Sequence, residues 1–214
     1  MKKRVMMLGK SSLLNGLMYH FQFDGDISDK CGNTTAQGYG SYSFKKGKIG
    51  HALSVNNGAY ILFKNTKNIS NTYTISAWYY ERNVRCEYAG IIYIRASGTL
   101  GIGLQTYNGK RTQALYYENL RTLYYPSTVG AWHLATITVE NRVAKVYRDG
   151  AYMGQLGSYN YALTNGCNIY IGVDSYSTSG RYFDGLIDQA ALWNRVLTAE
   201  EITTLYNGGN GLRL

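Results

Sequence analysis

Proline and charge are both scarce in this chain of 214 residues. Pro126 is the only proline, and charged residues make up 16% of the sequence, against about 25% in an ordinary soluble domain. The single proline excludes a proline-rich linker. The low charge argues against a coiled coil, in which many outward-facing positions are charged. No apolar run approaches the roughly 20 residues of a membrane-spanning helix. Hydrophobic residues nevertheless make up 45% of the chain, enough for a packed core.

Cysteine and histidine are also few, with three of each. The cysteines, Cys31, Cys86 and Cys167, are widely spaced and form no Cys-x-x-Cys pair. A zinc site is therefore not expected. The sequence leaves two alternatives open, a single disulfide or three free thiols, of which we favour the free thiols because a domain of this size needs no cross-link.

Basic residues outnumber acidic ones, mainly in the first third of the chain. Residues 1–67 hold ten Lys or Arg and three Asp or Glu, and the whole chain has a formal charge of +9. Such a balance favours an anionic partner. We do not expect nucleic acid to be that partner, because the charges are dispersed among turns and no nucleic-acid-binding motif accompanies them.

Turn signals are dense. Asn-Gly or Asp-Gly occurs nine times, at 15–16, 24–25, 57–58, 108–109, 149–150, 165–166, 184–185, 207–208 and 210–211. Between these dipeptides lie short runs rich in β-branched and aromatic residues, at 60–63, 73–80, 91–95, 100–107, 133–140, 143–148 and 168–173. Several alternate in the period of two that half-buried strands show. The pattern predicts one all-β domain, a sandwich or barrel.

One helix is clearly signalled near the C-terminus. Thr198 and Glu201 form a capping box, and Gly208 and Gly209 follow as a left-handed stop. The sequence predicts a helix of about two turns over 198–207. We expect it to plug one end of the sandwich.

The motifs have a recognisable order. They are Gly16-Leu17-Met18-Tyr19-His20-Phe21-Gln22-Phe23-Asp24-Gly25, Gly47-Lys48-Ile49-Gly50-His51-Ala52-Leu53, Tyr73-Thr74-Ile75-Ser76-Ala77-Trp78, Trp132-His133-Leu134-Ala135, Val146-Tyr147-Arg148-Asp149-Gly150 and Phe183-Asp184-Gly185-Leu186-Ile187-Asp188-Gln189. This series resembles the concanavalin A-like, laminin-G-like jelly-roll domains related to pentraxins, over about residues 14–210. The resemblance implies an all-β, antiparallel β-sandwich (jelly roll) with one short C-terminal helix.

Catalytic constellations are hard to build from this sequence. The histidines are His20, His51 and His133, and no Gly-x-Ser-x-Gly nucleophile elbow is present. A glycosidase needs two converging carboxylates, and the Glu-x-Asp-x-x-Glu strand of some enzymes with this fold does not occur here. We therefore predict that the chain is not an enzyme. Trp78 and Trp132 are interpreted as core anchors, with sugar stacking as the alternative.

A structural calcium ion is expected from the resemblance, since similar domains often hold one between the first and last strands. The matching positions are Asp24 and Asp188, and carboxylate oxygens suit calcium. The acidic residue that usually follows the second aspartate is Gln189 here. The alternative is that Asp24 binds turn amides and that Asp188 pairs with Arg195 or accepts from a backbone donor.

Tyrosine is abundant, with 22 residues, and its side chain is suited to binding ligands. Tyrosine rings offer flat faces to sugars and rigid anchors to proteins. Leu-Tyr-Tyr occurs twice, at 115–117 and 123–125. If both segments are strands, one tyrosine of each pair should point toward the core and the other toward solvent. The predicted glycan-binding residues, which would line a concave face, are Tyr80, Arg95, Arg111, Tyr117 and Tyr125. The alternative is that these tyrosines only cover the sheet.

The first thirteen residues precede every motif and contain four cations and no acid. We expect residues 1–13 to be an attachment arm and 14–214 to be the domain. Val5, Met6, Met7 and Leu8 would be buried against another copy or another virion protein. Their apolar run is too short for a signal peptide.

The start without a signal peptide and the basic arm favour a non-enzymatic virion protein, a phage capsid or tail decoration that binds glycans. The alternative is a secreted or surface carbohydrate-binding lectin, hence an extracellular location. Membrane insertion is not expected.

Overall fold

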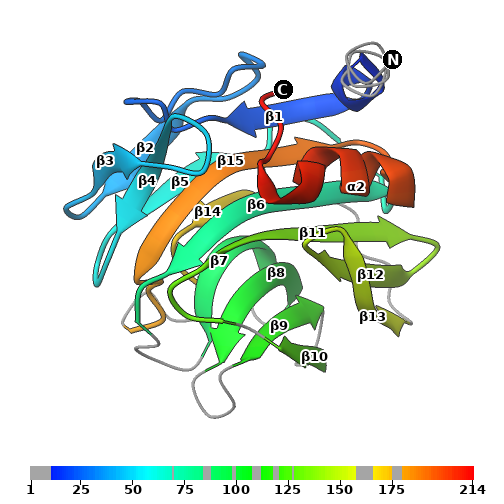
Figure 1. Cartoon of the computed structure of the whole chain (residues 1–214). Helices are drawn as coiled ribbons and strands as arrows, with labels where there is room; N and C mark the ends of the chain where they lie inside the picture. The colour runs from blue at the N-terminus through cyan, green and yellow to red at the C-terminus, as the bar shows by residue number, and fades with distance from the viewer. Residues whose placement is uncertain are drawn as a thin grey trace.

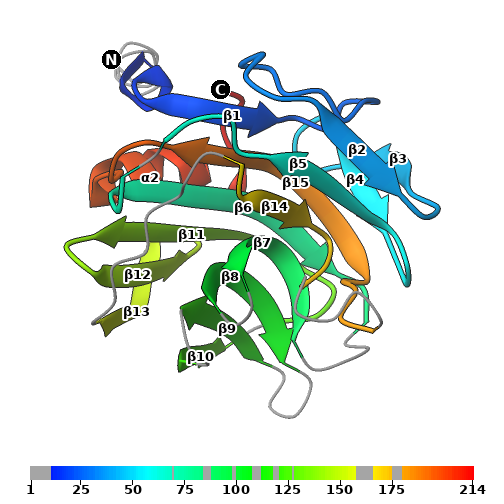
Figure 2. The ribbon, with the colours of Figure 1, turned by 180° about the vertical axis from the view of Figure 1, so that it is seen from behind.

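The computed structural model describes residues 11–68, 70–83, 88–97, 100–107, 112–117, 121–126, 128–157, 166–174 and 180–214. Residues 95–97, 100, 101, 107, 112–117 and 121 are described by their backbone alone. Two antiparallel sheets lie face to face as a sandwich, with one α-helix near the C-terminus (Figures 1 and 2). The predicted antiparallel β-sandwich with one short C-terminal helix is confirmed.

The first sheet, sheet A, has the strand order β13-β12-β11-β6-β15-β4-β3, and β1 also pairs with β15. Its strands are β1 (Leu17–Phe21), β3 (Ser43–Lys46), β4 (His51–Val55), β6 (Tyr73–Glu81), β11 (Trp132–Glu140), β12 (Val143–Arg148), β13 (Ala151–Gly157) and β15 (Gly185–Trp193).

The second sheet, sheet B, has the order β10-β9-β8-β7-β14-β5-β2. Its strands are β2 (Ala36–Tyr39), β5 (Tyr60–Lys64), β7 (Ala89–Ser97), β8 (Leu100–Tyr107), β9 (Thr112–Tyr117), β10 (Arg121–Pro126) and β14 (Asn168–Ile171). Each of the seven predicted runs overlaps a strand, namely β5, β6, β7, β8, β11, β12 and β14. The other strands, including β15 at the centre of sheet A, lie outside those runs.

The main core lies between the sheets, because each strand turns every second side chain inward. Ile75 and Ile137 of sheet A and Ile61 and Ile169 of sheet B are fully buried there. The alternate residues on each strand face outward. These two outer faces are where the molecule can meet partners.

Helix α2 (Ala199–Tyr206) lies across the outer face of sheet A (Figure 1). Thr198 and Glu201 form the predicted capping box, but Asn207 is already left-handed (φ 51°), one residue before the predicted glycine stop. The helix buries Ile202 and Leu205 in a second apolar cluster. The predicted position, at one end of the sandwich, was wrong, because the outward face of sheet A is itself apolar here and requires a cover.

Three outward-facing residues form the floor of that second cluster: Trp78, Leu134 and Trp193. Trp78 is 1% exposed and its ring stacks with Tyr206 at 5.8 Å. This burial supports the core-anchor interpretation of Trp78, whereas Trp132 on the same face is only partly buried.

The N-terminal segment is held against the same cluster. Leu13 is fully buried, and its carbonyl oxygen accepts a hydrogen bond from Trp193 Nε1 at 2.7 Å. Arg195 donates to the carbonyl oxygens of Ser12 and Asn15 and forms a two-point ion pair with Glu201. These hydrogen bonds lower the pKa of Glu201 to about 2. Ser12 and Leu13 of the predicted arm therefore contact the domain, and residues 1–10, with Val5 to Leu8, lie outside the described residues.

Candidate functional site

Four tyrosine rings gather on the outer face of sheet B. Sheet B lies on the side of the sandwich away from α2 (Figure 2). The four tyrosines are Tyr39 of β2, Tyr60 of β5, Tyr170 of β14, and Tyr182 just before β15, and we call them the tyrosine surface. The Tyr39 and Tyr60 rings stack at 4.7 Å with 7° between their planes. Tyr60 also contacts Tyr170 at 6.2 Å and Tyr182 at 6.3 Å. Tyr60 is therefore the centre of the group.

Strand register explains why these rings lie together. Tyr39 is directly opposite Tyr60, and β5 in turn pairs with β14. Ile61 and Phe63 of β5 face the core, so Tyr60 and Leu62 face outward. All four tyrosines are partly exposed. Partly exposed rings held by their neighbours form a preorganised aromatic platform.

Polar groups border the platform. Asn168 Nδ2 donates to the Tyr170 hydroxyl at 3.1 Å, and Gln37 and Lys64 are exposed on the same strands. Partial burial, and then the neighbouring tyrosines, raise the pKa of Tyr60 above its usual value. The hydroxyl group thus stays protonated at neutral pH and can both donate and accept.

The predicted glycan-binding residues are not brought together as one face. Tyr80 lies on the outer face of sheet A, where its ring contacts Trp132 at 5.8 Å. Arg95 and Tyr117 belong to strands β7 and β9 of sheet B, and only their backbone is described; Arg111 lies outside the described residues. Tyr125 is 3% exposed and packs in the core, whereas its neighbour Tyr124 is 36% exposed.

One tyrosine of the 124–125 pair faces the core and the other faces solvent, as predicted. The exposed residue is Tyr124, however, and not Tyr125, which was predicted to bind a glycan. Tyr125 is hidden from any surface ligand, and burial raises the pKa of its phenol. The tyrosine surface was missed because its members are far apart in the sequence and occur singly.

Asp24 and Asp188 both bind the turn formed by residues 47–51. Asp24 Oδ1 accepts from the His51 amide at 2.7 Å, and Asp188 Oδ2 accepts from the Ile49 amide at 2.8 Å. The alternatives in which Asp24 binds turn amides and Asp188 accepts from a backbone donor are therefore observed. Arg195 pairs with Glu201 instead of Asp188.

The remaining oxygens of these two carboxylates differ in burial and in their partners. Asp188 is fully buried, and its Oδ1 has no hydrogen-bond partner among the described residues. Burial raises the pKa of Asp188 to about 7, and the charge of Asp24 contributes to the increase. Asp24 Oδ2 forms an ion pair with Arg213 at 2.5 Å. Within the described ranges, no group of three or more His, Cys, Asp or Glu side chains is arranged to hold a metal.

A β-bulge adjoins Asp188. Gln189 has φ 48° in the middle of β15, and its Oε1 lies 2.9 Å from His20 Nε2. Positive φ at a non-glycine residue costs about 1–3 kcal/mol and is common at ligand sites. The bulge interrupts pairing between β15 and β6 at the position of the buried carboxylate.

The thiols of Cys31 and Cys167 are free, and Cys86 lies outside the described residues. Among the helices of the described chain, none has the length and apolar character needed to cross a membrane.

Solved structures with the same fold include one domain of an arabinanase and the binding domains of several toxins. Domain 4 of AbnA, an extracellular arabinanase of family GH43 from Geobacillus stearothermophilus, was solved with arabinotriose; it is 23% identical over 87% of this chain and 96% of that chain, with a TM-score of 0.74. The binding domain of Paraclostridial Mosquitocidal Protein 1 is 17% identical, with a TM-score of 0.71, and the match covers 92% of this chain and 53% of that one.

The botulinum neurotoxin serotype G binding domain is 13% identical, with a TM-score of 0.66 and coverage of 88% and 50%. This chain therefore spans about half the length of the toxin domains that it matches. At these identities the likeness concerns the fold alone. No curated protein matches the chain. The sequence profile of the concanavalin A-like lectin/glucanases superfamily matches residues 55–203, so the chain belongs to that family.

Proposed function

We propose that this chain is a non-catalytic, glycan-binding module and that the tyrosine surface is its contact with the sugar. The observation that carries the proposal is the contact of three partly exposed tyrosine rings with a fourth, Tyr60. Sugar rings present apolar C–H faces that stack on tyrosine, while their hydroxyl groups bond to amides such as Asn168. A domain with this fold has been solved in complex with arabinotriose, which supports a saccharide as the ligand class.

Hydrolysis of a glycan would need catalytic carboxylates in addition to an aromatic binding surface. A glycosidase places two carboxylates about 5–10 Å apart on either side of the scissile bond. The tyrosine surface consists of aromatic rings bordered by amide and ammonium groups. We infer that this surface holds a glycan without cleaving it, so prolonged incubation with arabinotriose should release no shorter products.

The test is affinity for a panel of neutral oligosaccharides, arabinotriose included, measured by calorimetry. Tyr60→Ala is expected to weaken the best binder about tenfold or more, because it removes the ring that contacts the other three. Tyr124→Ala, another exposed tyrosine of sheet B, is the matched control and should bind normally. Equal affinity of the Tyr60→Ala variant and the wild type would remove the tyrosine surface from the proposal.

We also propose that Asp24 and Asp188 bind a structural calcium ion. The buried Oδ1 of Asp188 has no hydrogen-bond partner in the described part of the chain, and both carboxylates lie close to residues 47–51. Both observations fit an oxygen-liganded cation. When bound, calcium would compensate the buried charge. Arg213 already neutralises Asp24 and would have to share that carboxylate.

Calcium at 100 times its dissociation constant is expected to stabilise the fold by about 2.7 kcal/mol. The melting temperature should therefore rise with calcium and fall again with a chelator. Asp188→Asn should abolish this response, whereas Asp26→Asn, an exposed aspartate that pairs with Lys30, should retain it. A wild-type melting curve that is identical with calcium and with chelator would exclude a stabilising metal.

We propose a virion decoration or adhesion role as the biological setting, with a secreted or surface lectin as the alternative. The support is the sequence of the first ten residues, which combine Lys2, Lys3, Arg4 and Lys10 with Val5 to Leu8. Deletion of residues 2–10 should leave the melting temperature unchanged and weaken attachment to the assembly. The deletion ends before Leu13 because that side chain belongs to the domain. Full attachment of the deleted protein would favour the lectin alternative.

A further inference from the structure

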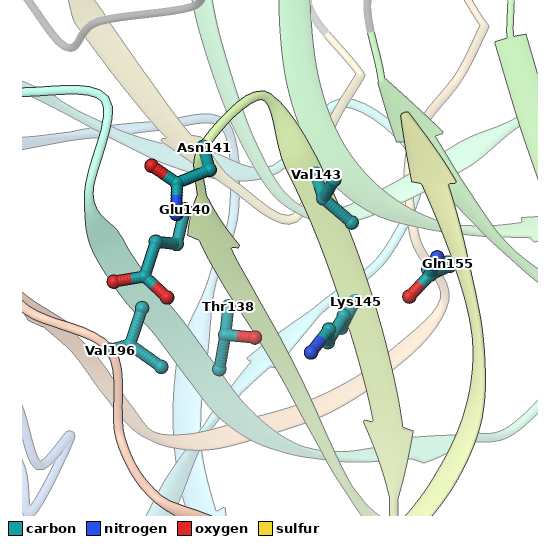
Figure 3. A pocket seen from close by; sticks show the side chains of 7 residues that line it. All are labelled: Thr138, Glu140, Asn141, Val143, Lys145, Gln155 and Val196. Carbon is teal, nitrogen blue, oxygen red and sulfur yellow. The ribbon is translucent and has the colours of Figure 1, made fainter. Parts of the chain in front are cut away.

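A polar groove of about 310 Å³ lies on the outer face of sheet A, the opposite side of the sandwich from the tyrosine surface. Strands β11, β12 and β13 form it, and Val196, in the segment before α2, closes one side (Figure 3). Its lining residues are Thr138, Glu140, Asn141, Val143, Lys145, Gln155 and Val196. This volume falls within the range of small-molecule sites.

The register of three strands brings the lining side chains together. Thr138 is opposite Lys145, which is opposite Gln155 on the next strand, and Glu140 is opposite Val143. The intervening residues, such as Val139 and Ala144, are buried in the core. The lining side chains of the three strands therefore project from the outer face, and Val196 lies across from them on the segment before α2, as the sticks in Figure 3 show.

Several polar side chains of the groove make no hydrogen bond or ion pair with another described residue. The side chains of Glu140 and Lys145 carry opposite charges, yet neither side chain forms an ion pair or a hydrogen bond with another described residue. Gln155 Oε1 accepts from the Tyr152 hydroxyl at 3.2 Å, which leaves its amide nitrogen available. A groove with free donors and free acceptors is complementary to a ligand that has both.

An aromatic pair stands beside this groove. Tyr152 is 53% exposed, the highest fraction among the large hydrophobic side chains identified as exposed in the described chain. Its ring meets Tyr147 edge-on at 5.6 Å. Through the hydrogen bond to Gln155, the Tyr152 ring is held at the rim of the groove.

We propose that this groove is a second binding site and that it takes a short, neutral oligosaccharide. The opposite charges of Glu140 and Lys145 cancel, so the site has no net attraction for a charged ligand. Val143 and Val196 supply apolar contact, the polar side chains supply both donors and acceptors, and Tyr152 supplies a stacking face. The ligand class follows the proposed function, but the site is separate. A chain with sugar sites on both outer faces can bridge two glycan strands.

The test is titration of isotope-labelled full-length protein with neutral trisaccharides, namely arabinotriose, maltotriose, cellotriose and triacetylchitotriose, followed by NMR. At least one sugar should shift the amide signals of residues 138–145 and 155. Lys145→Met and Glu140→Gln should each weaken that response about tenfold, because each leaves ligand hydroxyl groups without a charged partner. Tyr60→Ala should leave it unchanged.

The variants separate the two sites. If Tyr60→Ala abolishes all sugar binding while the groove variants bind normally, the groove proposal is overturned and the tyrosine surface stands. If the groove variants lose the response and Tyr60→Ala does not, the groove is the sugar site and the tyrosine surface is not. No signal change at 138–145 with any of the four sugars overturns the groove. All altered side chains in the groove are exposed, and unchanged melting temperatures would confirm folding.

Discussion

Truncation of Trp193 to alanine is expected to lower the free energy of unfolding by about 3–5 kcal/mol. Trp193 is fully buried under α2, and its Nε1 donates to the Leu13 carbonyl oxygen. The substitution removes the largest side chain shared by β15, the helix and the N-terminal segment, and leaves a cavity that Ala cannot fill. Urea unfolding followed by circular dichroism measures the loss.

Trp132→Ala is the matched control, because Trp132 packs against the same apolar cluster but is only partly buried. It should cost clearly less than Trp193→Ala. The Trp193→Ala variant should also become sensitive to protease between residues 11 and 16, since Leu13 loses its partner. Equal destabilisation by the two substitutions would contradict the anchoring role assigned to Trp193.

Replacement of Glu81 by glutamine is expected to stabilise the protein at pH 8 by on the order of 3 kcal/mol. Glu81 is 2% exposed, on the inner face of β6, and burial raises its pKa from 4.5 to about 7. Below pH 4.5 the carboxyl is protonated in both the folded and unfolded states. Between pH 4.5 and 7 the unfolded state releases the proton first, so wild-type stability falls as pH rises.

Glutamine cannot ionise, so the variant escapes this loss. Its advantage over the wild type should be near zero at pH 4.5, grow through pH 7 and then level off. The measurement is the unfolding free energy in urea at several pH values. Glu140→Gln, which alters an exposed glutamate on neighbouring β11, is the control, and it should change the unfolding free energy little. An advantage for Glu81→Gln that is the same at pH 4.5 and pH 8 would mean that the carboxyl titrates normally.

Local signals made the secondary structure predictable. The capping box at Thr198 and Glu201 involves residues only three positions apart, and it predicted the start of α2 correctly. Short runs rich in β-branched and aromatic residues, several of them alternating in a period of two, located seven of the fifteen described strands, because such a pattern is a property of each strand alone. The order of the family motifs then predicted the sandwich.

Long-range pairing made the site difficult to predict. The tyrosine surface joins residues between positions 39 and 182, and only strand order and register bring them together. Alternation also does not say which of two neighbours faces the core, which is why Tyr125 was assigned to the surface. The position of α2 depended on the apolar outer face of sheet A, a property shared by β6, β11 and β15.

The central place of β15 in sheet A has a consequence for biosynthesis. This strand pairs with β6, β4 and β1, so residues 185–193 join segments that were translated much earlier. Until they leave the ribosome, β6 lacks one neighbour and β1 has no strand to pair with among those described. Contacts so distant in sequence slow folding and leave strand edges open to aggregation. Sheet A must therefore close after translation is nearly complete, which makes nascent chains of this protein candidates for protection by chaperones.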